Sequence, residues 1–247
     1  MKRHIIAALF SAVTLAAGAA SAETLKVAST PTGSPFTFLD TKTNSIEGVM
    51  VDIVKAVGKE AGFEVQIEPM QFSALIGSLK SKRVDLISAA MFITEERKKV
   101  VDYSAPVYSY GEGVVAPTED TTAYTKLEDL KGKRIGVQVG TAFVAPLQSS
   151  GLFSEVKLYD TTADLMRDAN AGRIDVGMLD YPIAAYAISQ KNFPNLRMVD
   201  SFKPTMVSDI GIATNKDNPE LLAKVNAAIE KLKGDGTIDA IVKKWGL

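Results

Sequence analysis

Hydrophobic positions along the chain follow two patterns in turn: short strand-like runs, and longer stretches with apolar residues three or four positions apart. Strand-like runs occur at residues 25–28, 64–67 and 84–87. Helical spacing occurs at 49–57, in a stretch that Gly62 ends, and at 72–79. This order of elements predicts a parallel sheet flanked by helices, an α/β fold.

Part of this pattern occurs twice. Residues 165–176 repeat residues 75–86, and in both copies a helical face leads through a basic residue and an aspartate into a strand. Five positions beyond these aspartates stand Ala90 and Asp180, just past the carboxyl ends of equivalent strands. Ligands of open α/β sheets bind at such strand ends, so the repeat predicts two equivalent binding edges.

The segments around the second copy complete the expected topology. A turn at 130–134 leads into a strand over 135–139, and Gly140-Thr141 is expected to open a helix with an anion-binding N-terminus. Residues 108–113 are expected to form the first crossover between the lobes. A strand over 210–214 and two helices, the second ending near Trp245, return the chain to the first lobe.

Arg97 is the first candidate for ligand binding. The strand at 84–87 runs toward a helix start at Thr94, and Glu95 and Glu96 occupy the first turn of that helix, as is typical of a helix N-terminus. A guanidinium beside free helix N–H groups is a good receptor for a carboxylate. The alternative is a surface ion pair with a neighbouring acid such as Asp102.

The N-terminus has the pattern of a secretory signal peptide. Lys2, Arg3 and His4 precede an apolar run over 5–17, and Ala20-Ser21-Ala22 is a cleavage site of small residues. The apolar run is too short to span a bilayer. With no cysteine in the chain, neither a disulfide nor a lipid anchor at the cleavage site is expected, and the predicted location is the periplasm.

Composition excludes several kinds of function. The only histidine, His4, leaves with the signal peptide, which removes the usual general base and a common metal ligand. Removal of Lys2 and Arg3 lowers the basic count from 28 to 26 against 29 acidic residues, a net charge of −3 over the remaining 225 residues. Nucleic acid is therefore not an expected partner.

Several motifs together resemble the type II periplasmic solute-binding proteins of ABC importers, in particular the amino-acid-binding family 3. The resemblance covers nearly all of the chain after the signal peptide. The segments that carry it are 48–53, Ile93-Thr-Glu-Glu-Arg97 with 101–104, 132–141, Gly172-Arg-Ile-Asp175 with Asp180, and 235–245.

This resemblance implies two α/β lobes, each a mainly parallel sheet flanked by helices, joined by a two-strand hinge that closes over the ligand. Lobe one is expected at 23–109 plus 209–247 and lobe two at 110–208. In relatives that bind amino acids, the residues matching Arg97 and Asp180 take the α-carboxylate and the α-ammonium, and the segment at Thr141 adds hydrogen bonds. The expected partner is a permease in the inner membrane, and the expected state is a monomer.

The expected site departs from the family pattern at several positions. Gly33 replaces a common aromatic residue and is expected to open space, Thr30 and Met50 stand where acids are common, and Ala90 and Phe92 replace small hydroxyl residues. Phe72 and Phe143 either cover the ligand or pack in the core. The expected ligand contacts are Thr30, Phe72, Ala90, Phe92, Arg97, Thr141, Ala142, Phe143 and Asp180, with no catalytic residue, metal or cofactor.

Two other functions remain open at this point. Some proteins of this fold are periplasmic enzymes such as cyclohexadienyl dehydratase, which need an acid or base in the cleft. The chain offers only Asp180, Glu95 or Glu96 for that role. The second alternative is a binder of a simple carboxylate, in which Asp180 pairs within lobe two.

Overall fold

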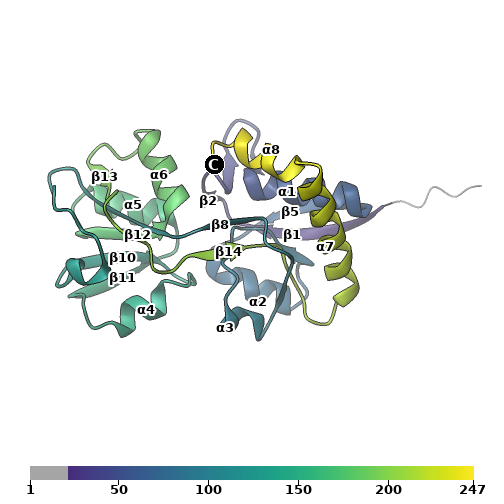
Figure 1. Cartoon of the computed structure of the whole chain (residues 1–247), viewed down its shortest axis with the longest axis horizontal. Coiled ribbons are helices and arrows are strands. Elements are labelled where there is room, and N and C mark those ends of the chain that lie inside the picture. The colour runs from purple at the N-terminus through teal and green to yellow at the C-terminus, as the bar shows by residue number, and fades with distance from the viewer. Residues whose placement is uncertain (1–21) are drawn as a thin grey trace, which may run out of the picture.

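The structure, a computed structural model, describes residues 22–247 and contains two five-stranded sheets at opposite ends of an elongated molecule (Figure 1). The predicted signal peptide at 1–22 lies outside the described residues except for Ala22. Within 22–247, no helix is both long enough and apolar enough to cross a membrane.

The first sheet has the strand order β5-β1-β6-β15-β7. Its first three strands are parallel, whereas β15 runs antiparallel to both of its neighbours. The strands are β1 (Glu23–Ser29), β5 (Phe63–Pro69), β6 (Leu86–Ile87), β7 (Asp102–Tyr103) and β15 (Ala213–Thr214). The helices of this part are α1 (Val49–Ala61), α2 (Leu75–Lys80), α3 (Glu95–Lys98), α7 (Pro219–Gly234) and α8 (Thr237–Lys244), with the short η1 (Phe72–Ala74) before α2.

The second sheet repeats this plan in the order β11-β10-β12-β9-β13. Again three strands are parallel, and the fourth, β9, is antiparallel to its neighbours. The strands are β9 (Glu112–Pro117), β10 (Arg134–Gln138), β11 (Glu155–Tyr159), β12 (Val176–Asp180) and β13 (Leu196–Met198). The helices are η2 (Leu127–Leu130), α4 (Val144–Ser149), α5 (Thr162–Asn170) and α6 (Tyr181–Ser189).

Two extended segments connect the sheets. They are β8 (Tyr108–Tyr110) and β14 (Ser208–Ile210), which pair antiparallel at the centre of the molecule (Figure 1). The strand that follows each crossover becomes the fourth strand of the sheet it enters, β9 after β8 and β15 after β14. The predicted architecture of two lobes joined by two strands is therefore confirmed.

A small sheet of β2 (Thr32–Gly33), β3 (Thr37–Asp40) and β4 (Ser45–Glu47) lies between β1 and α1 in the chain. Gly48 joins it to α1 with φ +126°, and a Cβ there would lie 2.3 Å from the carbonyl oxygen of Phe36. Only glycine fits this turn. All three strands of this sheet lie in the segment between the predicted strand at 25–28 and the predicted helix at 49–57.

Three predicted elements differ in extent from the structure. The strand at 84–87 is reduced to Leu86 and Ile87. The strand at 210–214 is interrupted, because the N–H of Ile212 donates to the Ser104 hydroxyl rather than to a strand. The helix expected at Gly140-Thr141 begins only at Val144, because Gly140 has φ +81° and the Thr141 hydroxyl donates back to the Gln138 carbonyl, which closes a turn first.

The aspartates of the sequence repeat have the same structural role in both lobes. Asp85 accepts a hydrogen bond from the backbone N–H of Lys26 at 2.8 Å, and Asp175 accepts one from the N–H of Arg134 at 2.7 Å. Each of these N–H groups belongs to the sheet's central parallel strand, β1 or β10. The repeat therefore preserves a side-chain link between neighbouring strands.

We expect Asp175→Ala to lower the free energy of unfolding by about 1–3 kcal/mol, because the N–H of Arg134 loses its acceptor. Chemical denaturation measures this change. Asp217→Ala is the control, since Asp217 forms only an exposed ion pair with Lys82, worth about 0–1 kcal/mol. Equal losses in the two variants would contradict the role assigned to Asp175.

Candidate functional site

A small cavity lies between the two lobes at the carboxyl ends of β1 and β12. Its volume is about 10 Å³, which is about the room that one water molecule needs and far below the range of about 300–1,000 Å³ for small-molecule sites. The residues that line it are Thr30, Thr32, Gly33, Phe36, Thr37, Phe72, Ala89, Ala90, Gln138, Thr162, Asp180 and Ile183. Both lobes contribute to its walls, and in this arrangement they meet closely enough to leave almost no free space.

The lobes touch directly around this cavity. The Thr162 hydroxyl at the start of α5 donates to the Thr32 carbonyl at 2.6 Å. On another side of the cavity the backbones of the two lobes are in close contact, because a Cβ added to Gly140 of the second lobe would lie only 3.0 Å from Cα of Ser73 in the first. The molecule is therefore in a closed arrangement, and any ligand in the cavity would be shielded from solvent.

The Arg97 side chain connects the lobes. Thr94 caps the N-terminus of α3 by accepting the N–H of Arg97, which places the arginine in the first turn as predicted. The guanidinium is buried and donates to the carbonyl of Phe92 at 2.7 Å and, across the cleft, to the carbonyl of Gly140 at 2.9 Å. These two bonds use two of its five N–H donors.

The alternative of a surface pair between Arg97 and Asp102 is wrong, because Asp102 pairs with Lys216. Burial lowers the pKa of Arg97, and nearby Tyr103, Tyr110 and Asp180 partly offset this effect. Arginine stays protonated in proteins despite such shifts. Arg97 is thus a buried cation at the edge of the cavity.

Tyr103 faces this cation. Its hydroxyl is buried and has no hydrogen-bond partner among residues 22–247. Burial raises the pKa of Tyr103 to about 12, although the charge of Arg97 acts in the opposite direction. The hydroxyl therefore keeps its proton and is available as a donor beside Arg97.

Asp180 ends β12 and lines the cavity from the second lobe. Burial raises its pKa to about 7, while Tyr110 and the charge of Arg97 lower it in part. Within the described part of the chain, no lysine or arginine forms an ion pair with Asp180. The site thus combines a buried cation from one lobe with an unpaired carboxyl group from the other.

The sequence of residues 25–247 matches the model of the bacterial extracellular solute-binding proteins, family 3. The chain belongs to this family. It is similar to the putative ABC transporter arginine-binding protein 2 of Escherichia coli (strain K12), with 34% identity over 99% of both chains.

Solved structures of similar fold include an ancestral arginine-binding protein bound to arginine, with 35% identity and a TM-score of 0.83 over 91% of this chain and 98% of that one. They also include the ancestral amino acid-binding protein AncCDT-1, a precursor of cyclohexadienyl dehydratase, with 29% identity and a TM-score of 0.80 over 90% and 95% of the two chains.

Some of the residues that the sequence predicted as ligand contacts lie in or beside the cavity, and the others do not. Thr30, Phe72, Ala90 and Asp180 line the cavity, and Arg97 lies beside Phe72, with its guanidinium carbon 5.7 Å from the ring centre. Ala90 adopts a left-handed backbone conformation with φ +52° at the sheet edge.

The other predicted contacts are not among the lining residues of the closed cavity. Phe92 and Phe143 are buried and pack edge to face against each other across the lobes, with ring centres 5.5 Å apart. Thr141 uses its hydroxyl in the turn before α4, and Ala142 follows it in that turn. Gly33 does line the cavity, but Ile183 from the other lobe fills the space expected beside it.

Sequence reasoning missed several lining residues. Gln138 ends β10, so the same strand-end rule that found Asp180 could have identified it. Thr162 stands at the first position of α5, and a helix start is a recognisable signal. Thr37 pairs with Thr30, and Ile183 is an ordinary apolar residue of α6, so no local pattern marks either one.

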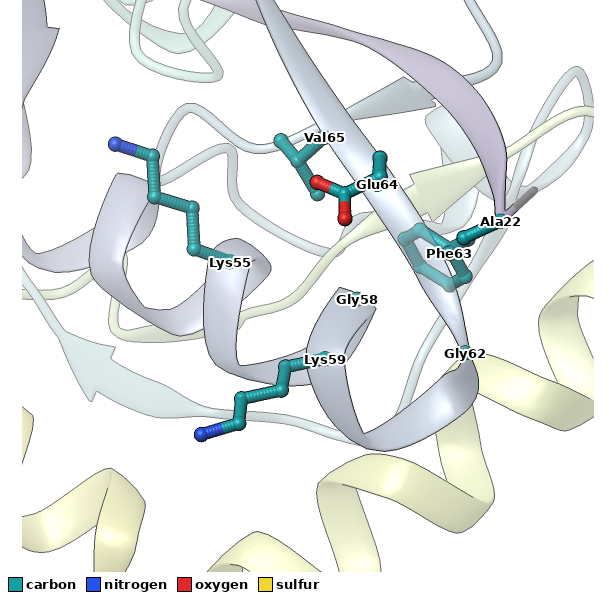
Figure 2. Close-up of a pocket in the computed structure, with 8 residues that line it drawn as sticks. All are labelled: Ala22, Lys55, Gly58, Lys59, Gly62, Phe63, Glu64 and Val65. Carbon is teal, nitrogen blue, oxygen red and sulfur yellow. The ribbon is translucent and has the colours of Figure 1, made fainter. Parts of the chain in front are cut away.

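A wider hollow lies far from this site, at the outer edge of the first sheet (Figure 2). It runs along the end of α1 and the start of β5, where the ammonium groups of Lys55 and Lys59 diverge and Glu64 lies over the strand (Figure 2). No convergent charges or donors meet there. Within 22–247, no cluster of three or more histidine, cysteine, aspartate or glutamate residues could hold a metal ion.

We expect Asp180→Asn to stabilise the ligand-free protein at high pH. Because the pKa of Asp180 is raised to about 7 in the folded state, the native protein binds more protons than the unfolded chain between about pH 4 and 7. Stability attributable to Asp180 therefore falls as pH rises through this window.

Chemical denaturation at pH 5 and pH 8 measures this effect. The advantage of Asp180→Asn over wild type should grow by about 1–3 kcal/mol between the two pH values. Asp217→Asn, at an exposed position, is the matched control and should keep the wild-type pH profile. An equal advantage of Asp180→Asn at both pH values would refute a raised pKa for this half-buried carboxyl group without an ion-pair partner within 22–247.

Proposed function

We propose that this protein is the substrate-binding component of an ABC importer, which captures an amino acid or amino-acid derivative between its lobes and delivers it to a permease in the inner membrane. The observation that carries the proposal is that Arg97 of one lobe and Asp180 of the other lie at one small closed cavity, which Asp180 lines and Arg97 borders beside Phe72. The relatives named as arginine-binding and amino acid-binding proteins support it.

In this proposal, the ligand carboxylate binds Arg97, where three N–H donors remain beyond the two backbone contacts, and Tyr103 is a further donor. The ligand ammonium binds the carboxylate of Asp180. A buried carboxyl without a cation is unfavourable, so Asp180 favours a ligand that supplies a positive group. The absence of a lysine or arginine partner for Asp180 within 22–247 argues against a simple carboxylate as ligand.

The lobes in this proposal are 23–109 plus 209–247 and 110–208. Both boundaries fall within the paired strands β8 and β14, so the hinge is placed there. The protein would act as a monomer in the periplasm after removal of its signal peptide.

An elimination reaction has little support from the site. Glu95 and Glu96 pair with Lys98 and Lys99 on the exposed side of α3, so they do not enter the cavity. Asp180 is the one carboxyl group that lines it, and residues 22–247 contain no histidine. The related ancestral precursor is itself described as an amino acid-binding protein.

A thermal-shift screen of the purified protein against amino acids, their derivatives and small organic acids tests the function. A true ligand at 100 times its dissociation constant should stabilise the protein by about 2.7 kcal/mol. For that ligand, the analogue that lacks the amine should bind at least about tenfold more weakly. Tighter binding of amine-free acids than of any amino acid would contradict the proposal.

Replacing Arg97 tests the carboxylate site. We expect Arg97→Ala to weaken binding of the ligand by about two orders of magnitude or more, because the loss of a buried charge-assisted partner costs about 2–5 kcal/mol. Calorimetry measures the affinity, and circular dichroism checks that the variant is folded.

Arg173→Ala is the control for this experiment, because Arg173 forms an exposed ion pair with Asp168 on the second lobe. It should retain wild-type affinity. A folded Arg97→Ala protein with nearly wild-type affinity would remove Arg97 from the site.

A further inference from the structure

A second pocket borders the interlobe cavity on the side of the second lobe. The two share Thr32, Thr162 and Ile183 as common lining residues. The outer pocket lies between the starts of α5 and α6 and the tip of β2. Its remaining lining residues are Ser34, Ala163, Met166, Tyr186, Ala187, Asn192 and Phe193.

The partition between the two spaces is thin. It consists of the hydrogen bond from the Thr162 hydroxyl to the Thr32 carbonyl and of the Ile183 side chain. Ile183 leans toward Gly33, where an added Cβ would lie 3.4 Å from its Cδ1. The absence of a side chain at Gly33 leaves room for this contact. A ligand side chain that extends from the cavity at this point would have to displace one hydrogen bond and one aliphatic side chain.

The outer pocket is mainly apolar and carries no charge. Met166, Ile183, Ala187 and Phe193 supply hydrocarbon, and the Tyr186 phenol is its one ionisable group. The nearest acid along α5, Asp164, does not line the pocket, because it is held by the Thr161 hydroxyl and by Arg167.

We propose that the ligand is an amino acid with an uncharged, mainly apolar side chain, and that this side chain passes between Gly33 and Ile183 into the pocket between α5 and α6. This inference rests on the proposed function, in which Arg97 and Asp180 bind the amino-acid head.

Counting charges supports this choice of ligand. Asp180 is the only carboxyl group that lines either space, and the ligand ammonium occupies it. A guanidinium or ammonium on the side chain would then find no carboxylate among the mainly hydrocarbon walls of the outer pocket, which is unfavourable. An acidic side chain is disfavoured in the same way, because no lysine or arginine lines the outer pocket. The ligand class therefore differs from that in the names of the arginine-binding relatives.

Calorimetry of the secreted protein with L-alanine, L-leucine, L-methionine, L-phenylalanine, L-arginine and L-lysine tests the inference. Affinity should rise from L-alanine to at least one of the larger apolar amino acids. L-arginine and L-lysine should bind about 100-fold more weakly than the best apolar ligand.

Filling the outer pocket gives a second test. Ala163→Leu and Ala187→Leu should each lower the ratio of the affinity for the best apolar ligand to that for L-alanine by about tenfold or more. Lys59→Ala at the outer hollow is the control and should leave that ratio unchanged. Two independent filling variants keep the test valid if one of them fails to fold.

The outcomes separate this inference from the proposed function. Tighter binding of L-arginine or L-lysine than of every apolar amino acid would overturn the inference and leave the function in place. An unchanged affinity ratio in the folded filling variants would overturn the outer pocket as the side-chain site. Failure of every amino acid and derivative to bind would overturn both proposals.

Discussion

The buried positive charge of Arg97 is the constraint on which the site depends. A cation removed from water is stable only if its N–H groups find acceptors. The structure supplies one acceptor from each lobe, the carbonyls of Phe92 and Gly140. The bond to Gly140 crosses the cleft, so the solvation of this charge depends on the contact between the lobes. A ligand carboxylate would meet the same need more strongly, since it is an anionic acceptor.

The two lobes share one structural plan but differ in the residues that stand where their strands end at the site. Both sheets have three parallel strands followed by one strand that runs antiparallel to both of its neighbours, and both use an aspartate to link neighbouring strands. At the equivalent position beyond these aspartates, one lobe has Ala90 in a left-handed turn and the other has Asp180. The duplicated framework therefore holds the strand ends in place, while Asp180 gives the second lobe an acidic group where the first lobe has Ala90.

The sequence predicts elements whose signal is local and leaves contacts between elements open. The helix α1 follows its apolar period and ends at Gly62 in a left-handed conformation, so its bounds were predictable. Thr94 likewise identified the turn that holds Arg97. In contrast, the sequence does not show whether Phe143 faces a ligand or packs against other side chains. The closed structure shows that its ring packs against Phe92 of the other lobe. Nothing in α6 indicates that Ile183 reaches across to Gly33, because that contact depends on how the lobes meet.

The distribution of charge and hydrocarbon also limits how selective such a site is. In the proposed complex, Arg97 and Asp180 form a complementary pair that rejects ligands lacking either charge, because an unpaired buried group costs several kcal/mol. The apolar walls discriminate far less, since each buried methylene contributes only about 0.8 kcal/mol. Recognition of the amino-acid head would then be strict, whereas the affinity would change only gradually from one apolar side chain to another. A site built this way accepts several related amino acids with affinities that follow their buried surface.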